Sequence, residues 1–225
     1  MNQPADQQRP FYLQYREPEY PINHIFLQRW SPRAYDASQM PVADLFTILE
    51  AARWAPSAYN IQPWRFLYAT RDDEYWDSYL DLLDSFNASW AKHASALVFV
   101  VSDEVMQGNG SSLPKQSRTH SFDAGAAWAQ LALQATALGY QAHAMAGILF
   151  DEVRQQLSIP ENFRIEIAVA IGKQTAPSSL PPALRQREVP SSRLPLEAIT
   201  FAGHFAPQQV EDTPGSNGTA GEDHP

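Results

Sequence analysis

Residues 55–64 read APSAYNIQPW and connect two segments of different periodicity. Before them, apolar residues from 42 to 52 recur at the spacing of an amphipathic helix, which Pro56 should end. After them, residues 64–68 (WRFLY) have the composition of a short aromatic strand. The stretch is therefore a helix-to-strand connection, and its serine, asparagine and glutamine side chains can bond amides or ring edges.

Further helices and strands are expected to alternate along the chain around one core, with no internal repeat. The expected elements are a helix over 22–29, a helix beginning at 72–74 with Tyr75, Tyr79 and Leu83 buried, a strand covered on both faces over 95–101, an alanine-rich helix over 124–137 ended by Gly139, a strand over 165–171, and extended chain over 176–195.

Composition excludes several classes of protein. The 225 residues include 25 acidic and 16 basic side chains, a net charge of -9, and no cysteine. Without sulfur ligands there are no disulfides, thiolate zinc sites, iron–sulfur clusters or cysteine nucleophiles. The acidic balance argues against nucleic acid as a partner. The longest apolar run, 96–101, is far below the roughly 18 residues of a membrane span. With a polar start lacking a signal core, the expected location is cytoplasmic.

The charge is unevenly distributed, which suggests a division of the chain. Residues 206–225 carry four acidic and no basic side chains and read as a disordered acidic tail. Residues 1–20 read as an N-terminal extension, and 21–205 as one folded domain. Five of the nine excess negative charges lie in the two terminal segments.

Local motifs for nucleotide, metal or hydrolytic chemistry are missing. The chain has no GxGxxG, P-loop or GxSxG sequence, and its six histidines are at least twenty residues apart, so no metal site is expected. Three polar groups remain: RWSPR at 29–33, the 55–64 stretch, and SSRLP at 191–195. The arginines could grip a phosphate through charge-assisted hydrogen bonds, or each could be an ordinary surface charge.

Taken together, the order and spacing of these groups resemble the nitroreductase family of FMN-dependent oxidoreductases. That family shows RxSxR, then a helix, then APSxxNxQPW. Further matches are Asn87 after Phe86, an Asp-Ala-Gly at 123–125 and a Leu-Gly at 138–139. The resemblance covers roughly residues 25–200. It implies an α+β fold with a mixed β-sheet flanked by helices, in an intertwined homodimer. The alanine-rich helix could then pack between subunits, or it could be a core helix within one chain.

The resemblance also implies the residues that bind FMN. Arg29, Ser31 and Arg33, with Trp30 between them, match positions that hold the phosphate, the ribityl chain and the pyrimidine edge. Arg193 matches a late phosphate clamp, and Asn87 a side chain that reaches the flavin O2 region. The remaining assignments are Ala146 and Gly147, whose backbone N–H groups would face flavin N5 and O4, and Pro56, Ser57, Ala58 and Asn60, which would cover the ring from the partner subunit.

For the substrate pocket wall the candidates are Tyr59, Trp90, His120 and Phe122. Two positions depart from the family pattern: Ser191 and Trp90 stand where many relatives carry a basic residue. The function that the resemblance implies is hydride transfer from NADH or NADPH through FMN to a small oxidant such as a nitroaromatic or a quinone. Alternatives are dehalogenation, azoline oxidation or flavin fragmentation on the same fold, or flavin storage without turnover.

Overall fold

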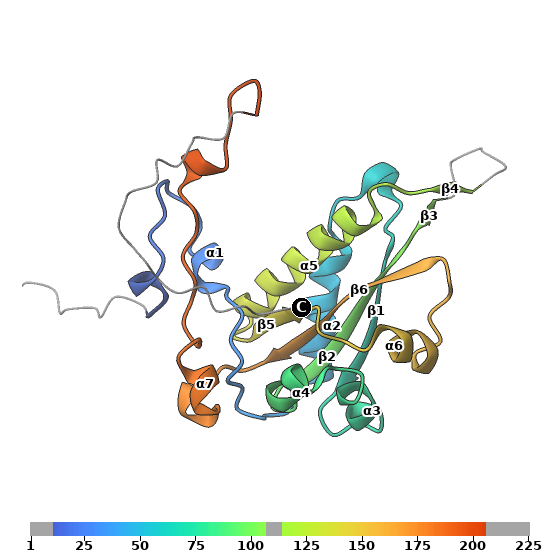
Figure 1. Ribbon diagram of the computed structural model, residues 1–225, viewed down its shortest axis with the longest axis horizontal. Helices are drawn as coiled ribbons and strands as arrows, with labels where there is room; N and C mark the ends of the chain where they lie inside the picture. Colours follow the sequence, from blue (N-terminus) through green and yellow to red (C-terminus); the bar gives the residue numbers. More distant parts are fainter. Residues whose placement is uncertain (1–10, 107–113, 206–225) are drawn as a thin grey trace, which may run out of the picture. The chain divides into compact units, whose positions relative to one another are not determined.

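A computed structural model of the chain describes residues 11–106 and 114–205. It comprises two compact units, Met1–Ser191 and Ser192–Pro225. The first unit contains a four-stranded sheet in the order β1-β2-β6-β5 (Figure 1). The strands are β1 (Trp64–Thr70), β2 (Ala96–Asp103), β5 (Gln141–Met145) and β6 (Phe163–Gly172). The predicted 206–225 tail lies outside the described residues.

The α+β class is confirmed, and one detail of the sheet differs from the expectation. A mixed sheet was expected, but all three strand pairs of the described sheet are antiparallel. Strand β6, the last in the chain, lies between β2 and β5 and runs antiparallel to both. Strand β2 lies at the centre with its side chains buried on both faces, as its continuous apolar run predicts.

Helices cover both faces of the sheet. One face packs against α2 (Val42–Arg53) and α5 (His120–Ala137), which contribute Leu45, Ile48 and Leu131 to a core with Val98 and Val169. The other face packs against α3 (Trp76–Leu80), α4 (Ser85–Ala91) and α6 (Phe150–Gln156) (Figure 1). The alternation of side chains along each strand divides the apolar residues between these two cores.

The remaining elements are short. They are η1 (Phe11–Gln14), α1 (Ile25–Gln28), η2 (Ala58–Asn60), β3 (Val105–Met106), β4 (Lys115–Gln116), η3 (Pro177–Ser179), α7 (Pro182–Arg185) and, in the second unit, η4 (Leu196–Ala198). Among the described helices, none combines the length and apolar character needed to cross a bilayer.

Helix α5 buries its small residues inside the chain. Ala124, Ala127, Ala132 and Ala135 face the core, and the helix ends where Gly139 adopts a φ of 82°. The left-handed conformation at that position fits the predicted glycine cap. The buried alanines therefore let α5 approach α2 and the sheet closely, as the core interpretation of the alanine-rich helix requires.

Two local predictions were wrong. Residues 176–195 were expected to run extended, but they contain η3 and α7, because proline is compatible with the first turn of a helix. Tyr75 was expected in the core with Tyr79 and Leu83, but it is exposed, because helix α3 begins one residue later and Tyr75 precedes its buried face.

Candidate functional site

The predicted site residues of the first unit fall into two groups. The first group gathers around the 29–33 segment, the second around the 56–62 loop. The first contains Arg29, Trp30, Ser31, Arg33, Asn87, Trp90, Ala146 and Gly147. The second contains Pro56, Ser57, Ala58, Tyr59, Asn60, His120 and Phe122. Arg193 belongs to the second unit, so its role as a phosphate clamp stays a prediction.

The 29–33 segment is tied to the edge strand β5 and to the chain after β6. The side-chain oxygen of Gln141 accepts from the backbone N–H of Trp30 at 3.3 Å, and the indole N–H of Trp30 donates to Gln174 at 3.2 Å. Further along, the Pro32 carbonyl accepts from Nδ1 of His143 at 2.9 Å. Pro32 favours an extended conformation at Ser31, so the segment is not helical. Its backbone groups therefore bond to the side chains of Gln141 and His143.

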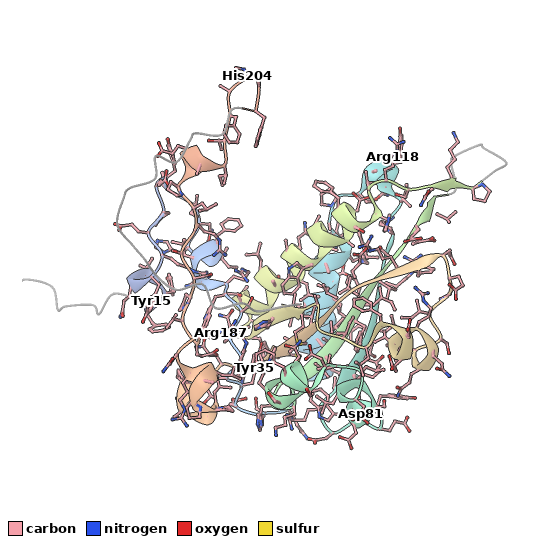
Figure 2. The ribbon with its side chains drawn as sticks, in the orientation of Figure 1. Tyr15, Tyr35, Asp81, Arg118, Arg187 and His204 are labelled. Carbon is pink, nitrogen blue, oxygen red and sulfur yellow. The ribbon has the colours of Figure 1, made fainter. Side chains whose placement is uncertain are left out.

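Two buried charged side chains that the sequence analysis missed also hold this segment. Glu188 is 2% exposed, and its Oε1 accepts from the backbone N–H groups of Arg33 (2.6 Å) and Ala34 (2.8 Å). Arg16 is 8% exposed, and it donates to the carbonyls of Leu27 and Arg29. In Figure 2 this region is marked by two labelled residues: Tyr35, which follows Ala34 in the sequence, and Arg187, which precedes Glu188. No sequence motif marks either buried charge.

The Arg33 guanidinium lies over the ring of Trp90, with its carbon 5.9 Å from the ring centre. Burial, and next the neighbouring Arg187, lower the pKa of Arg33, while Glu188 acts in the opposite direction. Trp90 was expected in the pocket wall, but its side chain is fully buried. It packs against His143 at 4.6 Å and Tyr35 at 6.3 Å between ring centres, because an indole on the inner face of α4 fills this core.

His143 is a neutral, hydrogen-bonded part of this support. Burial lowers the pKa of His143 to about 4. The hydrogen bond to Pro32 acts in the opposite direction, and the charges of Arg33 and Arg29 add to the decrease. At neutral pH the ring is therefore uncharged. Because a carbonyl oxygen only accepts, Nδ1 carries the proton that is donated to Pro32, and the ring presents its face to Trp90.

Asn87 and Gly147, far apart in sequence, are in direct contact. Asp84 caps helix α4 by accepting from the backbone N–H of Asn87 at 2.6 Å. The Asn87 side chain then donates to the Gly147 carbonyl at 3.1 Å. A Cβ at Gly147 would overlap Asp84 and Asn87, so the close approach requires glycine. The neighbouring Ala146 is exposed, and its backbone borders this junction.

The 56–62 loop is bonded to helix α5 through Asp123, and Pro56, Tyr59 and Asn60 are its exposed residues. The buried carboxylate of Asp123 accepts from the backbone N–H of Ala58 at 3.2 Å, and Ser57 Oγ accepts from the backbone N–H of Gln62 at 3.0 Å. Tyr59, Asn60 and Gln62 all have positive φ near 54°. Such angles are strained for residues other than glycine and cluster at functional sites. The Tyr59 side chain is 88% exposed.

Phe122 and His120 lie in the first turn of α5, near this loop. Phe122 is 82% exposed, whereas His120 forms a polar cluster with Ser102 and Glu166. Ser102 Oγ lies 2.8 Å from His120 Nδ1 and donates to Glu166 at 2.5 Å. A carboxylate accepts the hydroxyl proton, so the hydroxyl in turn accepts from Nδ1–H of His120.

The two groups lie at opposite ends of helix α5. The 56–62 loop reaches the first turn of α5 through Asp123. The 29–33 segment reaches the last turn, because Gln141 Oε1 accepts from both Trp30 and Thr136. Over the 18 residues of α5 the separation is about 27 Å at the rise of an α-helix. Figure 1 shows η2 and α1 near the two ends of α5.

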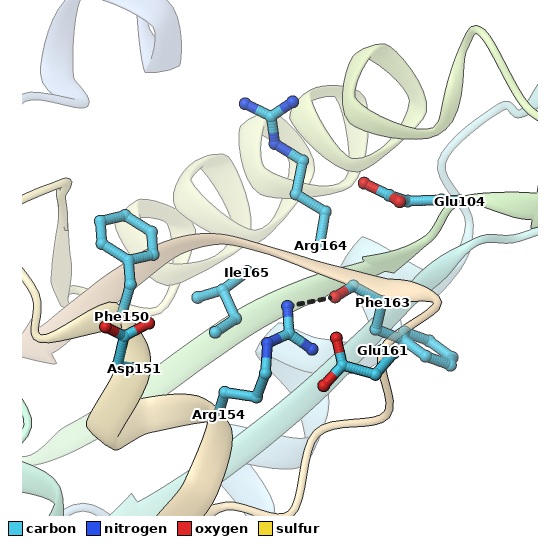
Figure 3. Close-up of a pocket in the computed structure, with 8 residues that line it drawn as sticks. All are labelled: Glu104, Phe150, Asp151, Arg154, Glu161, Phe163, Arg164 and Ile165. Carbon is cyan, nitrogen blue, oxygen red and sulfur yellow. Dashed lines mark hydrogen bonds between the residues drawn. The ribbon is translucent and has the colours of Figure 1, made fainter.

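A separate hollow lies outside both groups, between β6 and α6 (Figure 3). Its volume is about 350 Å³, and three acidic side chains, two arginines and two phenylalanines line it. Arg154 extends from α6 toward Phe163 (Figure 3), and its guanidinium donates to the carbonyls of Ile159, Pro160 and Phe163. The arginine thus stabilises the chain that leads into β6. None of the predicted site residues lines this hollow.

Comparison with known proteins identifies the family. The model of the Nitroreductase family matches residues 26–173, about two thirds of the chain. The chain belongs to the nitroreductase family. The matched range contains every predicted site residue of this nitroreductase-family chain except Arg193.

Individual relatives agree with this assignment. A solved structure described as an oxidoreductase containing FMN is 52% identical, with a TM-score of 0.83, over 86% of this chain and 97% of that chain. A protein named NADH dehydrogenase from Thermus thermophilus is 31% identical over 78% of this chain and 92% of its own. A putative nitroreductase from Desulfovibrio desulfuricans, solved in complex with FMN, is 25% identical with a TM-score of 0.64, over 84% of this chain and 100% of that chain.

Proposed function

We propose that this nitroreductase-family chain binds FMN and transfers hydride from NADH or NADPH through FMN to a small organic oxidant, such as a nitroaromatic or a quinone. The observation that carries the proposal is the 29–33 segment, which brings two arginines and a serine together and whose main chain is bonded by Arg16, Glu188 and His143. The printed descriptions of two relatives, one containing FMN and one in complex with FMN, support the same cofactor.

The polar atoms around the segment fit such a ligand. Among the described residues, Nε of Arg33 is a buried donor without a hydrogen-bond partner. An unpaired buried donor costs about 1–3 kcal/mol, so it favours a ligand that brings acceptors. FMN carries phosphate and carbonyl oxygens that accept hydrogen bonds, and the charges of Arg29 and Arg33 suit the phosphate.

Bound FMN would supply the hydride acceptor and donor for both halves of the reaction. The chain's own residues would bind and orient it. Arg29, Ser31 and Arg33 would hold the phosphate, the ribityl chain and the pyrimidine edge, while the Asn87–Gly147 junction would place the backbone of residues 146–147 against the ring. No side chain needs to act as an obligatory acid or base in this scheme, because solvent can supply the proton.

The position of the 56–62 loop favours a site built by two chains. Both groups are proposed to contact one FMN, yet they lie at opposite ends of α5 in one chain. A second copy in an intertwined homodimer would bring its 56–62 loop, with Tyr59 exposed, to the 29–33 segment of the first. His120 and Phe122 lie on the same side as the loop and would then border the substrate face.

The decisive experiment is anaerobic mixing of the purified yellow protein with NADH or NADPH. Rapid bleaching of the flavin absorbance is expected, and subsequent addition of a quinone or nitroaromatic should restore the colour. The chromophore released by denaturation should be FMN. A colourless protein that does not bind added FMN would refute the proposal, and a yellow protein that neither nicotinamide bleaches would point to flavin storage.

A further inference from the structure

Two buried charges outside the family-matched range hold the main chain of the segment within it. The family match spans residues 26–173. Arg16 precedes this range and Glu188 follows it. Both side chains are more than nine-tenths buried. Charged side chains are almost never so buried unless their polar atoms are paired, so each position needs an account.

Both side chains bond main-chain atoms on either side of the phosphate-binding residues. Before the segment, the Arg16 guanidinium donates to the carbonyls of Leu27 (3.0 Å) and Arg29 (2.6 Å), and also to the carbonyl of Ser191 (3.0 Å). After it, the Glu188 carboxylate accepts from the N–H groups of Arg33 and Ala34. Residues 29–33 are thereby fixed at both ends by charge-assisted bonds, which are about twice as strong as neutral ones.

We propose that Arg16 and Glu188 are positioning residues for cofactor binding: they hold the 29–33 segment in the conformation that presents Arg29, Ser31 and Arg33 to the FMN phosphate and pyrimidine edge. The inference rests on the proposed FMN site. Preorganisation of a binding segment raises affinity because less conformational entropy is lost on binding. The C-terminal chain, with its proline-initiated helix α7, delivers Glu188 to this place.

The sign of the Glu188 charge makes this proposal testable. A carboxylate beside a phosphate site repels the ligand, so through charge alone its removal would strengthen FMN binding. A role as the acceptor of two N–H groups predicts the opposite for Glu188→Ala. Glu188→Gln separates the two effects, since its amide oxygen can accept both N–H bonds without the negative charge.

The measurement is the FMN dissociation constant of the full-length apoprotein, determined by quenching of flavin fluorescence. Glu188→Ala should weaken binding by about tenfold or more, because two N–H groups lose their acceptor. Glu188→Gln should bind FMN as tightly as the wild type or more tightly. Arg16→Lys should also weaken binding, because one ammonium cannot replace the forked contacts to three carbonyls.

A double-mutant cycle with Arg33→Ala distinguishes positioning from general stability. If Glu188 acts through the segment, Glu188→Ala should weaken FMN binding far less in the Arg33→Ala background. Additive losses, or a Glu188→Gln variant as weak as Glu188→Ala, would overturn the proposal. If Glu188→Ala fails to fold, a cycle of Arg16→Lys with Arg29→Ala decides, because Arg16 bonds the carbonyl of Arg29. A wild-type protein that binds no FMN would instead refute the proposed function.

Discussion

The 29–33 segment and the 56–62 loop present similar polar residues, but the chain holds them in different ways. The first is bound at both ends by buried charges and backed by Trp90 and His143. The second is bound through Asp123, and it carries three residues with positive φ and an exposed tyrosine. A fully supported segment suits a charged ligand group that must be bound in one place. A strained, exposed loop suits a surface that another molecule completes.

The largest expected difference between the two regions is in stability. Trp90→Ala should lower the free energy of unfolding by about 3–5 kcal/mol, because a fully buried indole leaves a cavity beside His143. The matched change Phe122→Ala should cost less than about 0.5 kcal/mol, because that ring is exposed. Urea unfolding followed by circular dichroism measures both.

Equal losses in the two variants would contradict the contrast between the regions. A Phe122→Ala loss that grows with protein concentration would show that a second chain covers this ring, in agreement with the two-chain site. Trp90→Phe is the control for the indole N–H, because it keeps an aromatic ring against His143 and removes only the unpartnered donor and the larger ring volume.

A second, smaller difference should appear as a pH dependence of stability. The pKa of His143 is lowered to about 4 in the folded chain, from an ordinary value near 6.5. Between these values the unfolded chain binds a proton that the folded chain does not, so stability falls as the pH decreases from about 6.5 to about 4. The loss should reach up to about 3 kcal/mol.

His143→Asn isolates this contribution, because the amide N–H can replace Nδ1–H in the bond to Pro32 without titrating. The difference in unfolding free energy between wild type and variant should change with pH across that window and be flat above it. A constant difference from pH 4 to pH 7 would mean that the imidazole is protonated as easily in the folded chain as in the unfolded one.

The sequence predicted the elements with strong periodicity or composition, namely β1, β2, β6, α2 and α5. It missed α4, β5 and α6, whose local signals are weak. Helix α4 (SFNASWA) has seven residues, buries only Trp90 and Ala91, and begins at the Asp84 cap. Strand β5 (QAHAM) has no β-branched residue and forms because it pairs with β6. Tertiary pairing thus decided the elements whose local preference is weak.

For the candidate site, the resemblance brought together residues that the structure also brings together, such as Asn87 and Gly147. The sequence did not predict that Trp90 would be buried or that Glu188 would bond the main chain of Arg33. A lone glutamate in a proline-rich segment looks like a surface charge. Only the folded structure shows that it accepts a hydrogen bond from a main-chain N–H group 155 positions earlier.

The smallest expected stability effect concerns Tyr59 in the 56–62 loop. Tyr59→Gly removes an exposed ring and a positive-φ strain, while glycine adds entropy to the unfolded chain. These effects nearly cancel, so the free energy of unfolding should change by less than about 1 kcal/mol.

If Tyr59 borders the substrate face, the KM for a quinone should rise while FMN binding is unchanged. Tyr59→Ala separates the ring from the backbone strain, because it lacks the ring but keeps a Cβ at positive φ. An unchanged KM in both variants would remove Tyr59 from the pocket and leave the strain of this loop without a role in substrate binding.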